Sequence, residues 1–338
     1  MARSYAEAIR SGTMEAARLH ARLDTKRLLE VTGGGVDVFG AAREIGLTIL
    51  FRPLNSLLGA YMREPVPGAL VTTLRPMAIQ RFTGAHELGH HVLGHDPSLD
   101  ADGILRRSSM SLTDSGNGFQ EAEANAFAAA FVMPKWLIQQ MCVMRGWGPN
   151  HLRNPLIVYQ LSLRLGQSYE ALTWTLERYR MIDDRIGREL RETTPKQVKL
   201  ALLGEYRPES YRADVWLLTD LDRGLAIDGS KNDIFVLRLN ENSGAGYLWD
   251  AGQLVASGFA LLRDTTLATG DAQTVGGHVV REITASTEAA EAGDVIMRQV
   301  RPWQPQAPIA TFDFRYDVTG PEREGLSRAE RKILLEAA

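Results

Sequence analysis

Residues 86–95 read His-Glu-Leu-Gly-His-His-Val-Leu-Gly-His and contain the short pattern H-E-x-x-H. Because four residues advance an α-helix by slightly more than one turn, His86 and His90 share one face of the predicted helix. Two imidazoles on one face can bind a single Zn²⁺, and Glu87, beside the first of them, can take a proton from a water on that ion. The stretch therefore predicts a zinc helix that carries two ligands and a general base.

The same stretch is dense in histidine, because four of the seven histidines of the chain lie within it. A chance H-E-x-x-H is expected in roughly one chain in a hundred of this kind, so a solvated helix that happens to carry histidines is the alternative. The longer metzincin pattern needs Gly three and His six residues after the second ligand, but Leu93 and Asp96 stand there. We therefore interpret His91 and His95 as packing or surface histidines.

A second helix is predicted at 120–131, Gln-Glu-Ala-Glu-Ala-Asn-Ala-Phe-Ala-Ala-Ala-Phe, where small side chains allow close packing against a neighbour. Glu121 and Asn125 are four residues apart and share a face, whereas Glu123 points elsewhere. We predict Glu121 as the third metal ligand. Asn125 is predicted to accept a hydrogen bond from the far ring nitrogen of a ligating histidine, and Glu123 is interpreted as a solvated acid.

Four runs, taken in order, resemble a known family. They are Ala-Ala-Arg-Glu-Ile-Gly-Leu at 41–47, Arg-Phe-Thr-Gly-Ala-His-Glu-Leu-Gly-His at 81–90, Glu-Ala-Glu-Ala-Asn-Ala-Phe-Ala at 121–128 and Val-Met-Pro at 132–134. Through them residues 37–134 resemble the ImmA/IrrE family of bacterial metallopeptidases. The resemblance implies a soluble cytosolic protease that cuts a helix-turn-helix repressor and thereby switches on stress-response or mobile-element genes. It also implies His86, His90 and Glu121 as ligands, with Glu87 as the general base.

The composition indicates a globular protein of two or three domains. The chain has 338 residues, 44% of them hydrophobic, and a formal net charge of −3, which gives it no general affinity for polyanions. Its lone cysteine, Cys142, excludes an intramolecular disulfide and a cysteine-rich zinc site, and we expect it to be buried. The first residues lack the apolar core of a signal peptide, and no run is expected to reach membrane-spanning length. We therefore expect a cytoplasmic protein without membrane association.

Five segments can be distinguished along the chain. We predict a helical N-terminal arm at 1–35, a zinc metallopeptidase domain at 36–145, a helical module at 146–211, a β-sandwich at 212–320 and a C-terminal helical tail at 321–338. In the metallopeptidase domain a helix to Ile45 precedes strand candidates at 47–51 and 68–73. The polar stretch at 96–118 is interpreted as a mobile flap or a substrate-contacting loop, with a disordered insertion equally open.

Within the helical module, residues 158–165 and 169–176 are predicted to form two helices joined by a tight turn at Gly166. A helix-turn-helix DNA reader would look similar. The second helix, however, offers Glu170 and Glu177 and few basic or amide side chains, which equips it poorly to contact base edges. We therefore favour a packing module that flanks the protease, with DNA reading as the alternative.

The last third of the chain alternates apolar and polar residues in short runs separated by Gly-rich or Asn-rich turns. The runs lie at 215–218, 234–239, 279–283, 295–300 and 311–318. This spacing is typical of an antiparallel β-sandwich. The predicted fold class of the whole chain is thus α+β: a zincin-like metallopeptidase domain with a helical module, followed by an immunoglobulin-like antiparallel β-sandwich.

Three loops of this last region resemble those of the chagasin family of cysteine-protease inhibitors, which are small immunoglobulin-like sandwiches. They are Asn-Ser-Gly-Ala-Gly-Tyr at 242–247, followed by Trp249, then Gly276-Gly277, and Arg-Pro-Trp at 301–303. Where the family has a proline and two threonines in the first loop, this chain has Ser243, Gly244 and Ala245. The resemblance covers 212–320 and implies the fold, but the threonines that press on the target's catalytic cysteine in the family are absent.

The function predicted from these features is that of a zinc-dependent endopeptidase, with Mn²⁺ as an ion that suits the same ligands. The predicted partner is a protein substrate, a helix-turn-helix repressor, and the β-domain would serve partner recognition or regulation. Contact residues of that domain are predicted to be Tyr247, Gly276, Gly277, Arg301 and Trp303.

Alternatives from other functional classes stay open. One is a peptide- or protein-binding module, or a cysteine-protease inhibitor, on a degenerate zinc scaffold. Another is a DNA-binding regulator, which the acidic net charge disfavours. A further donor to the oxyanion, of the kind such enzymes often carry, is not assigned: Tyr61, His151 and Tyr179 are candidates by side-chain type alone.

Overall fold

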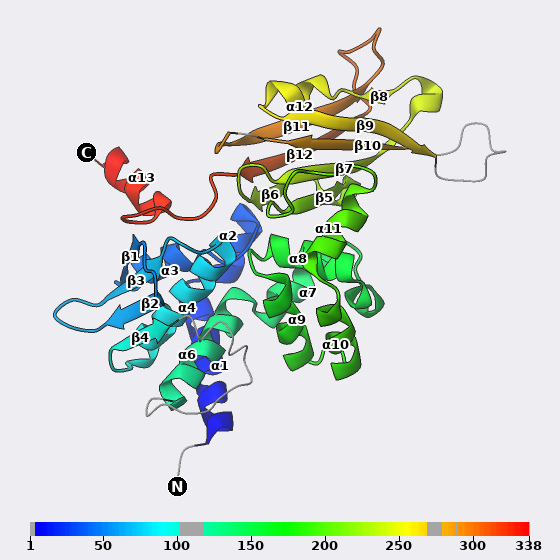
Figure 1. Cartoon of the computed structure of the whole chain (residues 1–338). Coiled ribbons are helices and arrows are strands. Elements are labelled where there is room, and N and C mark those ends of the chain that lie inside the picture. Colours follow the sequence, from blue (N-terminus) through cyan, green and yellow to red (C-terminus); the bar gives the residue numbers. More distant parts are fainter. Residues whose placement is uncertain (1–3, 102–117, 269–278, 288, 338) are drawn as a thin grey trace.

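The computed structural model describes residues 4–101, 118–268, 279–287 and 289–337. Three parts can be followed in Figure 1: an α/β part in blue and cyan, a helical part in green, and a β-sandwich above both. The C-terminal segment, in red, returns from the sandwich to the α/β part. A mixed α+β fold is thus confirmed.

The α/β part consists of one four-stranded sheet and the helices around it. Its elements are α1 (Tyr5–Arg22), α2 (Thr25–Thr32), α3 (Val38–Glu44), β1 (Thr48–Arg52), β2 (Leu57–Met62), β3 (Gly68–Thr72), α4 (Met77–Leu93), β4 (Ser98–Ala101) and α6 (Gly118–Val132). The strand order is β1-β3-β2-β4, with β1 parallel to β3 and the other neighbours antiparallel. Helix α4, which carries the H-E-x-x-H residues, packs against β2 and β3.

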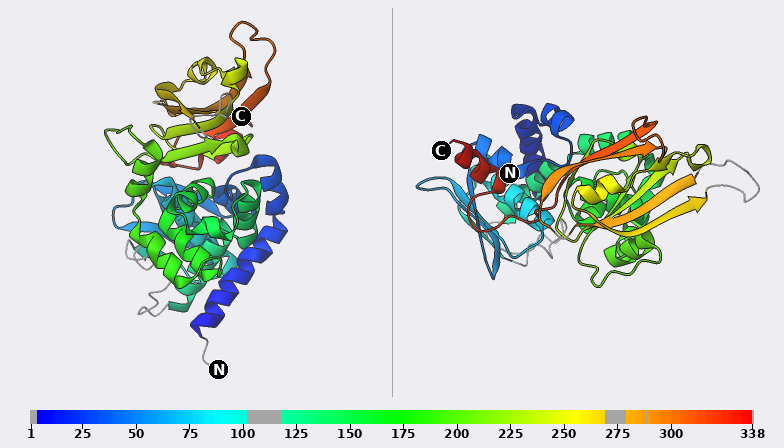
Figure 2. Two further views of the ribbon diagram at one scale, coloured as in Figure 1. Left: turned by 90° about the vertical axis from the view of Figure 1, so that its right-hand side faces the viewer. Right: turned by 90° about the horizontal axis from the view of Figure 1, so that it is seen from above.

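Helices α1, α4 and α6 approach one another closely because they meet through small residues. A Cβ atom at Gly12 of α1 would lie within 3.0 Å of the backbone carbonyl oxygen of Glu123 in α6. A Cβ atom at Gly89 of α4 would lie 3.2 Å from Cα of Ala124, also in α6. The segment predicted as a helical arm is therefore packed along α6, and α1 lies on the outside of the molecule in Figure 2.

One run, Gly118–Met144, is long and apolar enough to cross a membrane by length and composition. The expectation that no run reaches this length is therefore wrong. The run is divided between α6 and α7 (Lys135–Met144), with Pro134 at the N-cap of α7, and 67% of its most apolar window is buried in the structure. Core helices of soluble proteins have the same features, so the run is weak evidence for a membrane.

The helical part extends the same hydrophobic core. Besides α7 it contains η1 (Pro149–Arg153), α8 (Pro155–Arg164), α9 (Tyr169–Arg178), α10 (Asp184–Glu192) and α11 (Pro195–Leu203). Gly166, with a φ of 65°, occupies the predicted turn between α8 and α9, where the left-handed conformation suits glycine. Ser168 caps α9 by accepting a hydrogen bond from the N–H of Ala171. Cys142 is buried, as predicted.

The sandwich is formed by two four-stranded sheets that share a core. Its elements are β5 (Val215–Thr219), η2 (Asp220–Asp222), β6 (Leu225–Asp228), β7 (Ile234–Glu241), η3 (Ser243–Ala245), β8 (Leu248–Trp249), α12 (Gly252–Ala256), β9 (Ala260–Ala268), β10 (Val279–Ser286), β11 (Ala292–Val300) and β12 (Ala310–Asp317). The sheet orders are β5-β7-β10-β9 and β6-β12-β11-β8. Trp216 and Phe235 of the first sheet pack in one cluster with Phe314 of the second.

The sandwich departs from the prediction in strand direction. The predicted antiparallel pairing holds for β7, β9 and β10 and for β8, β11 and β12, but β5 pairs with β7 in parallel and β6 pairs with β12 in parallel. The physical reason lies in the connection: the chain leaves β5 and crosses to the second sheet as β6 before it returns to the first sheet as β7. Two parallel strands of one sheet need such a crossover between them, whereas antiparallel neighbours can be joined by a short hairpin.

Buried charges join the sandwich to the helical part. Arg145 and Arg164 both donate to Oδ1 of Asp222, at 2.9 and 2.7 Å, and all three side chains are buried. Gln160 of α8 donates to the carbonyl of Val215 in β5 at 2.7 Å. Because these groups lose their partners if the parts separate, the sandwich and the helices behave as one packed unit.

The C-terminal segment clamps the sandwich to the α/β part. The amide of Gln80 in α4, which is fully buried, donates to the carbonyl of Glu322 at 3.2 Å and accepts from its N–H at 2.7 Å. Gly325 then forms an antiparallel bridge with Phe51 of β1. Helix α13 (Arg328–Glu336) follows and lies beside the β1 edge in Figure 1.

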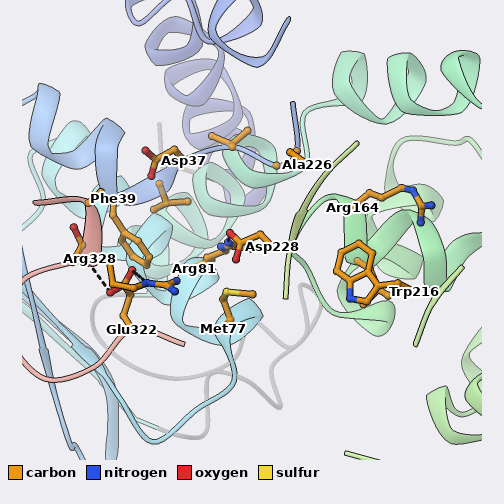
Figure 3. Close-up of a pocket in the computed structure, with 18 residues that line it drawn as sticks. Asp37, Phe39, Met77, Arg81, Arg164, Trp216, Ala226, Asp228, Glu322 and Arg328 are labelled. Atoms are coloured by element: carbon orange, nitrogen blue, oxygen red, sulfur yellow. Dashed lines mark hydrogen bonds and ion pairs between the residues drawn. The ribbon is translucent and has the colours of Figure 1, made fainter. Parts of the chain in front are cut away.

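A cavity of about 150 Å³ lies where the three parts and the C-terminal segment meet (Figure 3). On one side Arg81 of α4 forms an ion pair with Asp228 of β6. On another, Arg328 donates to Glu322 at 3.2 Å. Arg81 precedes His86 by five residues, so the helix with the H-E-x-x-H residues is anchored to the sandwich close to its first histidine.

Candidate metal centre

Two histidines of α4 and one glutamate of α6 converge on one point. The Nε2 atoms of His86 and His90 lie 3.0 Å apart, and both histidines are buried. Oε2 of Glu121 lies 3.3 Å from Nε2 of His86, and Oε1 lies 3.6 Å from Nε2 of His90. The structure thus brings together the three side chains that the sequence predicts as ligands.

These separations fit a tetrahedral metal ion. Ligand atoms about 2.1 Å from such an ion lie about 3.4 Å from one another. The Nε2 atoms of His86 and His90 lie 3.0 Å apart, and they lie 3.3 Å from Oε2 and 3.6 Å from Oε1 of Glu121, respectively, so each separation is close to that value. Two imidazole nitrogens and a carboxylate oxygen are also a donor set that suits Zn²⁺ or Mn²⁺. The residues present therefore fit the ion that the sequence predicts.

The far ring nitrogen of His86 is held by Asn125. Its Nδ1 lies 3.1 Å from Oδ1 of Asn125, one turn along α6 from Glu121. With Nδ1–H donated to the amide oxygen, the lone pair of Nε2 points toward Glu121, which is the tautomer a metal ligand requires. Asn125 thus lies where the spacing of the sequence predicts it.

The far ring nitrogen of His90 has a partner that the sequence analysis missed. Nδ1 of His95 lies 3.0 Å from Nδ1 of His90, and Nε2 of His95 lies 3.1 Å from Oε2 of Glu123. The interpretation of Glu123 as a solvated acid is wrong, because only 2% of the residue is exposed. Helix α1 lies against the backbone at this residue, since Gly12 leaves room for the close approach of the two helices.

His95 is a buried packing histidine, as one of the two interpretations had it, with 6% of the residue exposed, but the sequence analysis missed its contact with the predicted ligand His90. The helix ends before His95: Gly94, with a φ of 68°, turns the chain back, and the N–H of His95 reaches the carbonyl of His90. Helical spacing, which assumes that the helix continues, places His95 on the wrong side. A Gly directly before a His at the helix end is the signal that could have revealed it.

Burial and neighbouring imidazoles lower the pKa of His90 well below its usual range, with desolvation as the larger cause. Burial also lowers the pKa of His95, although its hydrogen bond to Glu123 opposes that shift. Both rings are therefore neutral near pH 7, which is the state in which an imidazole can bind a metal ion.

The predicted base, Glu87, is fully buried and lies against the sheet. A Cβ atom at Gly59 of β2 would lie within 3.0 Å of Oε1 of Glu87. The carboxylate therefore occupies space that is open only because Gly59 has no side chain. Strand β2 and helix α4 thus fix the position of the acid from two sides.

Of the three residues named as oxyanion donors by type, Tyr61 lies beside the candidate ligands. Its ring stacks on that of His90 with the centroids 6.1 Å apart, and its hydroxyl lies 3.4 Å from Nδ1 of His91. Burial raises the pKa of Tyr61 and so keeps its hydroxyl protonated as a donor. His151 instead accepts from the N–H of Gly148 in the helical part.

Comparison with protein families gives two matches in one chain. The model of the IrrE N-terminal-like domain, a peptidase family, matches residues 42–172. The model of the chagasin family of peptidase inhibitors matches residues 229–318. The chain joins an IrrE-like domain to a chagasin-like domain. Both resemblances predicted from the sequence are confirmed, and the candidate ligands lie inside the IrrE-like domain.

Solved structures with similarity to the chain include two whose matches cover about a third of it. The cysteine protease inhibitor EhICP2 from Entamoeba histolytica is 21% identical, and the match covers 32% of this chain and 99% of that one, with a TM-score of 0.28. Amebosin is 19% identical over 31% of this chain and 96% of that one, with a TM-score of 0.23.

A Mycobacterium tuberculosis transcriptional regulator is 12% identical over 84% of this chain and 81% of that one, with a TM-score of 0.29. TM-scores this low carry no argument about fold or function. No curated protein matches the chain.

The loops of the chagasin-like domain bring three of the predicted contact residues together. The guanidinium of Arg301 lies 4.5 Å from the ring centroid of Tyr247, and Trp303 packs over Gly246. Trp303 is 69% exposed, whereas Trp249 is buried and donates to the carbonyl of Asn240. The other two predicted contact residues, Gly276 and Gly277, lie outside the described residues, as does most of the stretch predicted as a flap.

Proposed function

We propose that this protein is a zinc-dependent endopeptidase of the cytoplasm that cleaves a helix-turn-helix transcriptional repressor and so derepresses stress-response or mobile-element genes. The observation that carries the proposal is the convergence of His86, His90 and Glu121 at separations that suit one tetrahedral ion. The match of residues 42–172 to a peptidase family supports it. The choice of substrate rests on the resemblance to the ImmA/IrrE family.

In the IrrE-like domain three residues would bind the metal ion and a fourth would transfer protons. A bound Zn²⁺, held by His86, His90 and Glu121, would polarise the scissile carbonyl and make water more acidic. Glu87 would take the proton of the attacking water and deliver it to the leaving amine. The burial of Glu87 against Gly59 holds its carboxylate in one place for both transfers.

The chagasin-like domain would serve recognition or regulation. Trp303 offers an exposed aromatic surface, and the ion–ring contact of Arg301 with Tyr247 orders the loop beside it. An aromatic and arginine-rich patch is the composition of residues that dominate protein–protein binding energy. Because the sandwich is anchored to α4 through Arg81 and Asp228, a partner on these loops would be held in fixed relation to the metal centre.

The proposal is tested by incubating the purified full-length chain with the helix-turn-helix protein encoded beside it. Parallel samples would contain EDTA, added Zn²⁺, or the Glu87→Gln variant. We expect one discrete cut, seen by mass spectrometry, which EDTA and Glu87→Gln both abolish. Cleavage by the purified chain that persists both with EDTA and in Glu87→Gln would contradict the proposal, because the proposed reaction needs the metal ion and the base.

A second candidate function is favoured by the match of residues 229–318 to a family of peptidase inhibitors. It is inhibition of a papain-like cysteine protease by the loops of the sandwich, with the metal centre in a supporting role. The replacement of the family's proline and threonines by Ser243, Gly244 and Ala245 weakens this candidate. Titration of papain with the full chain distinguishes the two, because inhibition at equimolar protein would favour the inhibitor.

A further inference from the structure

The chain contains a buried line of side chains that leads away from the metal centre. It runs from Nε2 of His90, across the ring to Nδ1, then to Nδ1 of His95 at 3.0 Å. From Nε2 of His95 it continues to Oε2 of Glu123 at 3.1 Å. The exposed fractions of His90, His95 and Glu123 are 0%, 6% and 2%. Three polar residues are therefore held out of water in one hydrogen-bonded row.

The arrangement has one proton distribution that suits a metal ligand. For His90 to offer the lone pair of Nε2, its proton must lie on Nδ1, which can then only donate to Nδ1 of His95. The proton of His95 must then lie on Nε2, from which it is donated to the carboxylate of Glu123. The carboxylate accepts and needs no proton. Each short contact of the row is satisfied by this one pattern, in which both rings are neutral.

We propose that His95 and Glu123 are positioning residues, which lock His90 in the tautomer and ring orientation needed to bind the metal ion. This inference rests on the metal centre of the proposed function. It assigns to α6 a double role, since Glu121 supplies a ligand and Glu123, two residues on, supplies the end of the row. It also assigns different partners to the two histidines: Asn125 holds His86, and His95 with Glu123 holds His90.

His95 is not a further ligand of the same ion. Its Nδ1 faces the far nitrogen of His90, across the ring from Nε2, and its own Nε2 is directed at Glu123. The backbone supports this placement, because Gly94 in the left-handed conformation turns the chain so that the N–H of His95 bonds to the carbonyl of His90 at 3.0 Å. Side chain and backbone of His95 are thus both fixed to the residue they orient.

Helix α1 completes the arrangement from the other side. It lies on α6 at Glu123, where Gly12 permits contact with the backbone carbonyl. The side chain of Glu123 is itself buried, with 2% of the residue exposed, and a charge-assisted hydrogen bond is stronger when it is shielded from solvent. The N-terminal helix is therefore part of the environment of the metal centre.

The test measures the dissociation constant of Zn²⁺ by competition with a chromophoric chelator in the full-length chain. Loss of a partner behind a metal ligand typically weakens metal binding 10–100-fold. We expect His95→Leu to weaken Zn²⁺ binding by about that factor. His95→Gln, whose amide can accept from His90 and donate to Glu123, is expected to recover much of the loss. His91→Gln, a histidine substitution in the last turn of α4, is the matched control and should leave the constant unchanged.

A second variant and a second signal keep the test decisive if His95→Leu does not fold. Glu123→Gln has nearly the same shape and can still accept from His95, but it loses the charge, so we expect a smaller weakening in the same direction. The absorption bands of the Co²⁺-loaded protein should shift in Glu123→Gln and stay unchanged in His91→Gln. Circular dichroism establishes that each variant is folded.

The outcomes separate the inference from the function it rests on. If the wild-type chain binds Zn²⁺ but folded His95→Leu and Glu123→Gln bind it equally well, the positioning role is wrong and the metal centre stands. If the wild-type chain binds no Zn²⁺ at micromolar concentration, the metal centre and the positioning role both fall. If affinity falls equally for His91→Gln, the effect is a general one of the helix end and the specific role is overturned.

Discussion

The carboxylate of Glu87 rests against the bare backbone of Gly59, where a Cβ atom would lie within 3.0 Å of Oε1. This contact ties the predicted base on α4 to a strand that contributes none of the candidate ligands. The position of the base therefore depends on β2 as well as on the helix that carries it.

Gly59→Ala should therefore reduce peptidase activity without removing the metal. The new methyl group would also press on the side chain of Thr83 in α4, so the carboxylate must move. Since small displacements of a catalytic group can cost about 100-fold in rate, we expect a loss of that order in kcat/KM with unchanged Zn²⁺ content. Gly68→Ala is the control, because its nearest neighbour would be 3.7 Å away.

Glu87→Gln should retain the metal and lose turnover, whereas His90→Ala should lose both. Removal of a general base typically costs 10²–10⁴-fold in rate, while removal of one of three ligands destroys the site. Metal content by atomic emission and cleavage of the same substrate distinguish the two effects. Wild-type turnover in Glu87→Gln would mean that another group is the base.

Removal of the metal should lower the thermal stability as well as the activity. An ion that binds the folded chain alone adds about 4 kcal/mol at a free concentration 1,000 times its dissociation constant. EDTA is thus expected to lower the melting temperature of the wild-type chain by several degrees, and added Zn²⁺ should restore it. In His86→Ala, EDTA should have no effect on melting, and a persistent shift there would place the stabilising ion elsewhere.

The free energy of unfolding should fall at acid pH, and His20 should account for part of that fall. Burial lowers the pKa of His20 to about 4, and its ring stacks on Phe131 between α1 and α6. The pKa of His20 in the folded chain lies below the unfolded value of 6.5, so the unfolded chain takes up a proton first as the pH falls. The contribution of the neutral, buried ring to the free energy of unfolding is therefore complete above pH 6.5 and is lost as the pH falls towards 4.

Between pH 7 and pH 5 the expected loss of unfolding free energy from this group is about 2 kcal/mol. Urea titrations at the two pH values measure it, and His20→Gln should show a correspondingly smaller difference. An identical difference in the variant would assign the acid sensitivity to other groups.

The buried hydrogen bonds between Gln80 and the backbone of Glu322 should contribute more to stability than the exposed ion pair of Arg52 with Glu324. Gln80→Ala removes hydrogen bonds to the backbone of Thr72 and Glu322 inside the protein, which costs about 2–4 kcal/mol because those groups lose their partners. Arg52→Gln breaks a 2.6 Å ion pair with Glu324, but both side chains are more than half exposed, so less than about 1 kcal/mol is expected. Equal effects in urea unfolding would contradict this ranking.

Local spacing predicted much of the candidate site. The H-E-x-x-H motif and helical spacing predict His86, His90, Glu121 and Asn125, the family resemblance implies the first three as well, and the structure brings these four side chains together. That periodicity is reliable inside α4 and α6 because these positions lie within the helices and not beyond their C-terminal ends.

The residues of the site that sequence analysis missed lie beyond a helix end or depend on contacts between segments distant in sequence. His95 follows a left-handed glycine, and Glu123 lies where α6 packs against α1, a helix more than 100 residues away in sequence. Strand β2 was also missed, because four consecutive residues are buried and no alternation marks it. The parallel pairing of β6 with β12 joins distant segments, which a local pattern cannot reveal.

The bridge between Phe51 and Gly325 has a practical consequence for fragments of this protein. Strand β1 is at the edge of its sheet, and the C-terminal segment occupies its free backbone groups at that residue. A fragment cut after the helical part would leave this edge open, and open edges template pairing with other chains. Fragments without the C-terminal segment are therefore expected to aggregate. Enzymatic assays should therefore use the full-length chain and not the isolated IrrE-like domain.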